Sequence, residues 1–309
     1  MPTVILLGPQ RFTRTLSEAA ARAGIAGRFA SVTAGWQERE AEDLDLHEHL
    51  GERTVNLMLY ARAEDALERD PQLASAWRDR QDRLRGLQAL YRVRLGHAQA
   101  ALRELASAEA APELLRAERE EALAAIRALD AGHLARIDGV ESEFEARVSP
   151  RSRPAVPRHL AALERLVERA EAILVAGGHV AVLLNRLRLF DSGRLLARRT
   201  LLAWSAGAMA VAERVVLFHH SPPQGYGNSE ILDRGLGLVR GVVAFPHAHR
   251  RLRLDDPRRM ELLARRFAPA DCLTLDDGAW MIDREGEREY VRGVARLGAD
   301  GLVVPLAAA

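Results

Sequence analysis

The chain has 309 residues, enough for one large domain or two modest ones. Hydrophobic residues make up 48% and charged residues 28%, which is typical of a globular protein with a sizeable core and a hydrated surface. The net charge of +1 gives no overall field that would favour nucleic acid or an acidic membrane surface. All 44 basic side chains are arginine, which excludes a Schiff-base lysine and a phosphate-loop lysine.

The single cysteine, Cys272, excludes an internal disulfide and a cysteine-rich zinc site. It opens an apolar stretch, so we expect a small buried side chain rather than a nucleophile. The N-terminus lacks a basic region followed by a signal-type apolar core, and no apolar run reaches membrane-spanning length. We therefore expect a cytoplasmic protein without a membrane partner.

The N-terminal residues predict the start of a parallel sheet. Residues 3–8 form an apolar run typical of a buried strand, residues 15–23 have helical character, and residues 27–33 indicate a second strand. A strand, a helix and a strand at this spacing favour a parallel sheet covered on both faces. The turn at 8–11 lacks the glycine pattern of a dinucleotide or phosphate loop, so we expect no nucleotide cofactor.

The composition changes between residues 38 and 145, which are dense in Ala, Leu, Glu and Arg and poor in Gly, Pro and β-branched residues. Apolar residues such as Leu87 and Leu90 recur at helical spacing. Pro71 and Pro112 mark interruptions of the helical pattern. The pattern predicts two or three long helices, arranged as an antiparallel hairpin or a coiled-coil arm.

Two roles for this helical segment stay open from the sequence. It is either a partner-binding or dimerising arm, which would give a homodimer, or a helical cap packed on the sheet. Its charges alternate as on a solvated face, so we expect no nucleic-acid site. The predicted organisation is an α/β domain formed by residues 1–37 and 151–309, interrupted by a helical insertion over 38–150.

The sheet pattern resumes after a proline-containing linker at 151–157. Helical stretches at 160–170 and 180–189 alternate with short apolar runs that are typical of strands. The predicted strands are 172–176, 200–203, 215–218, 241–245, 272–275, 279–282 and 302–304.

The strand over 200–203 leads into Trp204-Ser205-Ala206-Gly207, where an apolar run ends at a serine flanked by small residues. An alanine-rich, helix-forming segment follows. A strand, a serine and a helix in this order form an elbow, which projects the hydroxyl from the carboxyl end of the strand beside backbone N–H groups. Ser205 is therefore a candidate nucleophile, and the alternative is a serine that caps a helix N-terminus.

Three further motifs accompany this serine segment along the second half of the chain. Gly177-Gly178 follows an apolar strand, Gly235-Leu236-Gly237-Leu238 precedes Pro246-His247, and Leu275-Asp276-Asp277-Gly278-Ala279 comes late. In this order the four motifs resemble the glycine pair, nucleophile elbow, histidine segment and late hairpin of the cyanophycinase and dipeptidase E family of serine peptidases. The resemblance implies a class I glutamine-amidotransferase-like fold, which is a flavodoxin-like three-layer α/β sandwich with a mostly parallel sheet. The helical segment has no counterpart in that family.

The resemblance also implies a role for each site residue, in a serine hydrolase that cleaves a peptide or isopeptide bond of a peptide-like substrate without a cofactor. Ser205 would attack the carbonyl carbon and form an acyl-enzyme, and His247 would take its proton as general base. The backbone N–H groups of Gly178 and Ala206 would bind the oxyanion. His179 stands where the family often has an amide or another polar residue in its substrate pocket.

The third member of the implied triad is missing from its expected place. The family carries an acid between the elbow and the Gly-Leu-Gly-Leu segment, but residues 218–226 contain no carboxylate. Glu230 could substitute if the loop folds back, and His220 or Gln224 could hold the imidazole by a neutral hydrogen bond. Two function classes therefore stay open: a serine peptidase with a displaced acid, or a catalytically degenerate member of the fold that binds or assembles through the helical arm.

Other histidines and arginines lie close to His247 in the sequence. Adjacent side chains such as His219 and His220 point to opposite faces of a strand, so we expect no metal site. The basic run at 250–253 is either a solvated helix start or a site for a substrate carboxylate or phosphate.

Overall fold

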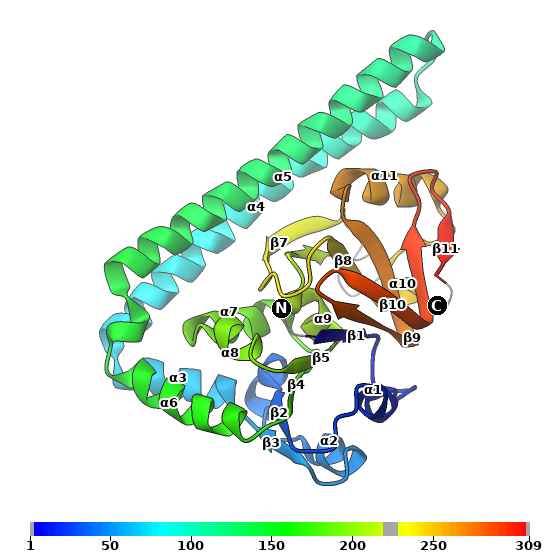
Figure 1. Cartoon of the computed structure of the whole chain (residues 1–309). Coiled ribbons are helices and arrows are strands. Elements are labelled where there is room, and N and C mark those ends of the chain that lie inside the picture. The colour runs from blue at the N-terminus through cyan, green and yellow to red at the C-terminus, as the bar shows by residue number, and fades with distance from the viewer. Residues whose placement is uncertain (1–2, 219–227, 307–309) are drawn as a thin grey trace.

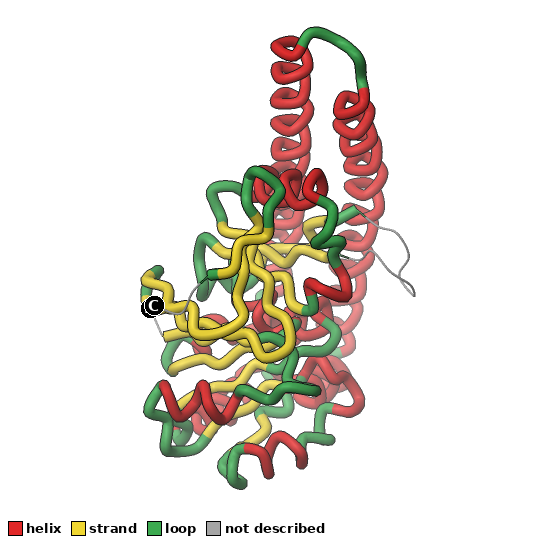
Figure 2. Tube along the Cα trace, turned by 90° about the vertical axis from the view of Figure 1, so that its right-hand side faces the viewer, coloured by secondary structure: helices red, strands yellow, loops and turns green. Residues whose placement is uncertain are grey.

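The computed structural model describes residues 3–218 and 228–306. Helices cover both faces of a central, largely parallel sheet, and one long helical hairpin projects from this body (Figure 1, Figure 2). The predicted fold class, an α/β sandwich with a long helical insertion, is confirmed.

The described residues form a nine-stranded sheet in the order β11-β10-β9-β1-β5-β4-β2-β3, with β8 paired to β9. Strands β3, β2, β4, β5 and β1 run parallel, whereas β9 is antiparallel to β1. Strands β6 and β7 form a separate two-stranded sheet. The strands are β1 (Thr3–Leu7), β2 (Phe29–Val32), β3 (Thr54–Asn56), β4 (Ala172–Val175), β5 (Thr200–Trp204), β6 (Arg214–Leu217), β7 (Glu230–Arg234), β8 (Val242–Pro246), β9 (Asp271–Arg284), β10 (Glu287–Leu297) and β11 (Val303–Pro305).

Most of the helices are short elements packed on the sheet, and two are much longer. The α-helices are α1 (Leu16–Arg22), α2 (Leu44–His49), α3 (Leu59–Arg69), α4 (Pro71–Ser107), α5 (Pro112–Val148), α6 (Ala155–Glu168), α7 (Val180–Leu189), α8 (Ser192–Leu196), α9 (Ala206–Val211), α10 (Ala248–Arg251) and α11 (Pro257–Phe267). Two 3-10 helices, η1 (Ala34–Arg39) and η2 (Pro150–Ser152), complete the set. Within the described residues, none of these helices is both long and apolar enough to cross a bilayer.

The strands are apolar on both faces because each face supports its own hydrophobic core. Along β1, Val4 and Leu6 belong to the core that also contains residues of α3, α6, α7 and α9. Ile5 and Leu7 point to the other face and pack with residues of α1 and α2. This alternation of side chains along a strand explains why the sequence shows a continuous apolar run instead of an apolar–polar alternation.

The carboxyl ends of three central strands meet at one edge of the sheet. Leu7 at the end of β1 pairs with Trp204 at the end of β5, and Val175 at the end of β4 pairs with Ala203. The segments that leave these strands therefore begin side by side. This is the edge at which open α/β sheets bind ligands.

The long hairpin consists of α4 and α5, each of 37 residues, which pack against each other along their length (Figure 1). Pro71 and Pro112, which the sequence marks as interruptions, are the first residues of the two helices. A proline suits this position because its fixed φ is compatible with helix and its missing N–H would have no intrahelical partner. We call α4 and α5 the arm.

The sequence pattern misses several elements. The predicted strands 272–275 and 279–282 are parts of one continuous strand, β9, whose pairing to β10 shifts register between them. The segment 38–150, predicted as a helical insertion, also contributes β3, which pairs with β2 at the edge of the sheet. The division of the chain into two domains stays a prediction.

Candidate active site

Ser205 lies between the end of β5 and the start of α9, in a sharp turn of the backbone. Its φ of 52° and ψ of −123° fall in a region that residues other than glycine rarely adopt. The small neighbours make this turn sterically feasible. A Cβ at Gly207 would lie 2.1 Å from the carbonyl oxygen of Val175, and a Cβ at Gly177 would lie 2.7 Å from the Cβ of Ser205.

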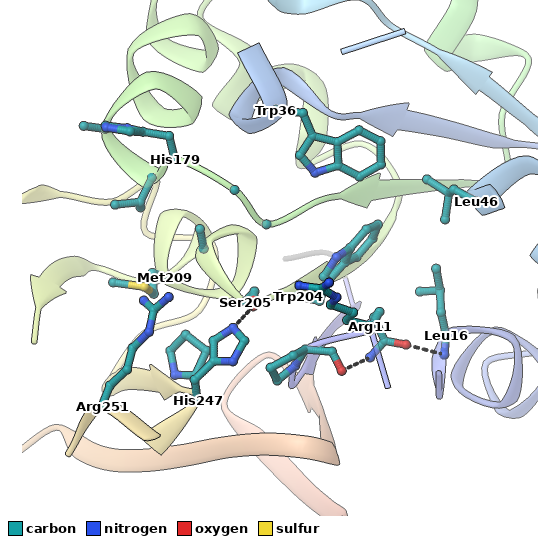
Figure 3. Close-up of a pocket in the computed structure, with 18 of the residues that line it drawn as sticks. Arg11, Leu16, Trp36, Leu46, His179, Trp204, Ser205, Met209, His247 and Arg251 are labelled. Carbon is teal, nitrogen blue, oxygen red and sulfur yellow. Dashed lines mark hydrogen bonds between the residues drawn. The ribbon is translucent and has the colours of Figure 1, made fainter. Parts of the chain in front are cut away.

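His247 follows β8 at the same edge of the sheet and faces the serine. Its Nε2 lies 2.9 Å from Ser205 Oγ, within hydrogen-bond distance (Figure 3). Its backbone N–H donates to the carbonyl oxygen of Leu275 on β9, and its φ of 57° turns the chain into α10. If the serine hydroxyl donates to Nε2, the imidazole proton resides on Nδ1, which is the tautomer a general base needs.

A cavity of about 850 Å³ surrounds this pair (Figure 3). Segments that follow β1, β2, β4, β5 and β8 line it. The lining residues are Pro9, Gln10, Arg11, Arg14, Leu16, Trp36, Asp45, Leu46, His49, Gly177, Gly178, His179, Val180, Ala181, Trp204, Ser205, Ala206, Met209, Leu217, Phe218, Leu232, Pro246, His247 and Arg251. The size lies within the range of cavities that hold small-molecule or short peptide ligands.

Two backbone N–H groups beside Ser205 are available to a ligand. Gly178 and Ala206 both line the cavity, and neither N–H donates a hydrogen bond within the described part of the chain. The glycine turn lies against the serine turn, because a Cβ on Gly177 would lie 3.5 Å from the nitrogen of Ala206. The predicted oxyanion donors therefore border the same cavity as the serine.

His179 follows the glycine pair and occupies the N-cap of α7. Its Nδ1 accepts a hydrogen bond of 3.3 Å from the backbone N–H of Val182, and its ring lines the cavity. The residue thus helps to start the helix and also borders the space above Ser205.

The pKa of His247 is lowered from its ordinary value. Burial is the main cause, since it disfavours the charged imidazolium, and the guanidinium of Arg251 acts in the same direction. The carboxylates of Asp277 and Asp276 oppose this effect, and Arg250 adds to the lowering. The imidazole is therefore neutral, and able to accept a proton, at neutral pH.

The candidates for the acid of the triad do not join this pair within the described residues. The carboxylate of Glu230, at the start of β7, accepts two hydrogen bonds of 2.8 Å from Arg92 on the arm. His220 and Gln224 lie outside the described residues. Over 3–218 and 228–306, no carboxylate is hydrogen-bonded to His247, and the nearby Asp276 instead binds the imidazole of His249 at 2.7 Å.

Asp276 and Asp277, whose charges act on His247, were not predicted from the sequence to do so. The signal was present, since they belong to the late-hairpin motif. What the sequence could not give is that β9 pairs with β8, whose last residue, Pro246, is in register with Leu275. This pairing carries the two aspartates to the turn that holds the histidine.

The charged residues of the cavity are mostly cations. Arg11 and Arg14 follow β1, Arg251 ends α10, and Asp45 is the one carboxylate among the lining residues described. Asp45 lies 3.8 Å from Arg14, and no ion pair joins Arg11 or Arg251 to a described carboxylate. The turn after β1, which lacks a nucleotide-binding pattern, thus contributes positive charge to the cavity.

Cys272 does not reach this site. It is 1% exposed, and burial raises the pKa of its thiol to about 12. The expected small buried side chain is what the structure contains.

Comparison with known proteins gives one family. Residues 138–290 match the model of peptidase family S51. The predicted resemblance to the cyanophycinase and dipeptidase E family is thereby confirmed. The matched S51 segment contains Gly177, Ser205 and His247, and the match supports a serine peptidase.

Two solved structures have partial similarity to the chain. A peptidase from an acI-B1 Actinobacterium has 13% identity and a TM-score of 0.46, over 97% of this chain and 91% of its own. A provisionally assigned peptidase E protein from Listeria monocytogenes EGD-e has 16% identity and a TM-score of 0.31, over 45% of this chain and 66% of its own. The search of curated proteins gave no match.

Proposed function

We propose that the protein is a serine peptidase that cleaves a peptide or isopeptide bond through an acyl-enzyme on Ser205, with His247 as general base. The observation that carries the proposal is the 2.9 Å contact between Ser205 Oγ and His247 Nε2. The same cavity is bordered by the backbone N–H groups of Gly178 and Ala206, which donate no hydrogen bond within the described residues. A nucleophile, a base and oxyanion donors around one empty volume are what acyl transfer requires.

In the first half of the reaction, Ser205 Oγ attacks the carbonyl carbon while its proton passes to His247 Nε2. The carbonyl oxygen becomes an oxyanion, which the N–H groups of Gly178 and Ala206 stabilise. Collapse of the tetrahedral intermediate breaks the C–N bond, and His247 returns the proton to the leaving amine. In the second half, water replaces the amine, His247 takes its proton, and hydrolysis of the ester frees the serine.

The imidazolium formed during each half needs stabilisation by negative charge. The carboxylates of Asp277 and Asp276 act on His247 in this sense. Because Asp276 is hydrogen-bonded to His249, its effect on His247 acts through space. We propose that these two charges take the place of the acid that the family carries between its elbow and its histidine segment.

The cavity suits a substrate with a carboxylate near the scissile bond. Arg251 lies beside His247 and Met209 (Figure 3), and its charge disfavours the imidazolium. A substrate carboxylate bound to Arg251 would form a charge-assisted pair and would also remove this opposition. We therefore propose peptides with an acidic residue next to the cleaved bond as the substrate class.

The test is hydrolysis of a panel of acidic and neutral peptides and isopeptides, followed by amine release. Wild type is expected to cleave acidic members preferentially, and His247→Ala to lose activity by at least about 1,000-fold. His97→Ala is the matched control, because this histidine is exposed on α4 and does not line the cavity. Equal activity of His247→Ala and wild type would reject the proposal.

A second function class stays open for one reason: within the described residues, His247 has no hydrogen-bonded carboxylate. A catalytically degenerate member of the fold would bind peptides in the same cavity without cleaving them. It would show saturable peptide binding in calorimetry, together with no amine release from any bound peptide.

The predicted homodimer through the arm also stays a prediction. The arm carries large exposed apolar side chains: Leu90 is 67% exposed, Val93 62% and Leu114 60%. Light scattering coupled to gel filtration measures the mass in solution. A dimer that dissociates on Leu90→Glu would support this partner, and a monomeric wild type would reject it.

A further inference from the structure

A second cavity of about 640 Å³ lies next to the one around Ser205. Helix α7 forms one wall, and α3 and the first turns of α4 form the others. The lining residues are Glu64, Leu67, Glu68, Ala74, Trp77, Arg78, Gln81, Ala181, Val182, Asn185 and Arg186. The walls from α3 and α4 belong to the segment that has no counterpart in the family resemblance.

The two cavities are neighbours along α7. Ala181, in the first turn of this helix, lines both of them. From Ala181 to Arg186 the helix rises by about 7 to 8 Å, at ~1.5 Å per residue. An extended peptide covers that length with about two residues, at ~3.3 Å each. A peptide that runs from the first cavity past Ala181 can thus span the second cavity along α7 with about two further residues.

Two buried polar atoms beside the second cavity have no hydrogen-bond partner within the described residues: Asn185 Oδ1 and Arg186 Nε. The guanidinium of Arg186 is held in place, because it binds Glu64 at 2.5 Å and stacks over Tyr60 at 5.0 Å. A buried polar atom without a partner costs stability, so a partner is expected. One acceptor and one donor are together the complement of a peptide unit, which offers one N–H and one C=O.

The charge of the second cavity differs from that of the first. Its lining contains two carboxylates, Glu64 and Glu68, and an equal number of guanidiniums, Arg78 and Arg186, so the charges balance. Its apolar lining comes mainly from Leu67, Trp77 and Val182. The cavity therefore favours an uncharged segment with an apolar side chain, whereas the cavity at Ser205 favours an anion.

We propose that the second cavity is a remote subsite for a peptide substrate, occupied by residues about two or more positions from the scissile bond. This inference rests on the proposed function. Asn185 and Arg186 bind the backbone of the substrate, and the walls from α3 and α4 accept an apolar side chain. The helical segment thereby makes the enzyme prefer oligopeptides of four or more residues over dipeptides.

The experiment compares an acidic dipeptide with hexapeptides that contain the same scissile bond and an apolar residue at either end. Wild type is expected to cleave one of the hexapeptides with a kcat/KM at least about tenfold above that of the dipeptide, as one filled apolar subsite provides. Ala74→Trp fills the second cavity and should abolish this advantage without changing dipeptide cleavage. Ser75→Trp is the matched control, because the neighbouring Ser75 is exposed and outside both cavities.

Thermal unfolding of both tryptophan variants shows whether the fold is intact. Should Ala74→Trp fail to fold, Val182→Ala removes part of the apolar wall and is expected to reduce the length preference. Equal kcat/KM values for the dipeptide and both hexapeptides, or a length preference that survives Ala74→Trp, would overturn the inference.

A binding measurement separates this inference from the proposed function. Titration of Ser205→Ala with the same peptides in a calorimeter is expected to give a hexapeptide Kd at least about tenfold below the dipeptide Kd. If wild type cleaves no peptide, the proposed function fails while this length dependence still tests the subsite. Equal Kd values, or no peptide binding, would overturn the subsite.

Discussion

The site around Ser205 and the junction between the arm and the sheet both bury polar side chains, but these side chains have many more hydrogen-bond and ion-pair partners at the junction than at the site. At the junction, Arg266 and Asp130 form an ion pair with side chains that are 0% and 8% exposed, and each charge has further partners. At the site, His247 has one side-chain hydrogen bond and Arg251 has no ion pair within the described residues. Buried polar groups whose hydrogen bonds are all made within the protein stabilise the fold, whereas buried polar groups without such partners are free to bind a ligand.

At the junction, the buried polar side chains are joined in one network of hydrogen bonds. Arg266 donates to both carboxylate oxygens of Asp130 at 2.7 Å and to the carbonyl oxygen of Ser229. The hydroxyl of Tyr91 donates to Asp130 and accepts from Arg266 and from the backbone N–H of Ile231. This network connects α4, α5 and α11 to β7, whose Leu232 lines the cavity around Ser205. The arm is thus anchored to the wall of the site.

The largest difference between the two regions should appear on Ser205→Ala. If Ser205 is the nucleophile, kcat falls by about 10⁴- to 10⁶-fold. The temperature of unfolding should stay within a few degrees of wild type, because one hydroxyl with one hydrogen bond is removed. Peptide cleavage and thermal denaturation measure the two quantities. A variant that unfolds at much lower temperature would place Ser205 with the junction instead.

Asp130→Ala, in contrast to Ser205→Ala, should reduce the free energy of unfolding strongly. It leaves the guanidinium of Arg266 buried without its carboxylate, which costs about 3–5 kcal/mol of unfolding free energy. Asp138→Ala is the matched control, since Asp138 pairs with Arg234 on the surface, where the side chains are 44% and 48% exposed. Its cost should be at most about 1 kcal/mol. Urea denaturation measures both, and similar losses for the two variants would contradict the contrast.

Gly177→Ala tests how tightly the site is built. The new Cβ would lie 2.7 Å from the Cβ of Ser205, so the elbow or the glycine turn must shift. A misplacement of this order costs about 100-fold in rate. Gly86→Ala on α4 is the control, because a Cβ there meets no atom within 4 Å. That variant should gain about 0.5–1 kcal/mol of stability and keep full activity. Steady-state kinetics and urea denaturation provide the readouts.

The smallest expected effect is a shift in pH dependence. The neutral imidazole of His247 is the active form, so the rate should fall as the pH drops through its lowered pKa. Arg251→Gln removes a positive charge that disfavours the imidazolium, which raises this pKa and moves the acidic limb to higher pH.

The rate of labelling by an uncharged fluorophosphonate, measured against pH, isolates this effect from substrate binding. Arg253→Gln, which changes an arginine outside the cavity, should leave the profile of wild type unchanged. An acidic limb that stays fixed in Arg251→Gln would show that this charge does not act on the base.

The sequence predicted those parts of the molecule that depend on local pattern. The strand before Ser205 and the helix after it were visible because an apolar run and an alanine-rich segment meet at one serine. Strand β10 was missed because its residues are mainly polar, as an extended hairpin with one exposed face allows. Strand β7 was missed because three of its five residues are charged and its pairing depends on β6.

The charges around the site could not be predicted in the same way. Arg11 follows β1 and Arg251 ends α10, far apart in sequence, and they share a cavity only because β1 and β8 both pair with β9. Glu230 was a reasonable candidate from its position in the chain. Its neighbour in space is Arg92, which belongs to the arm, and the sequence gives no measure of that contact.

The central claim is that Ser205 is an activated nucleophile, and fluorophosphonate labelling tests it most directly. Intact mass and peptide mapping of the labelled protein locate the adduct. The account predicts one adduct on Ser205 in wild type, none in Ser205→Ala, and labelling slower by at least about 100-fold in His247→Ala. A folded wild type that takes up no probe, or an adduct on another residue, would contradict it.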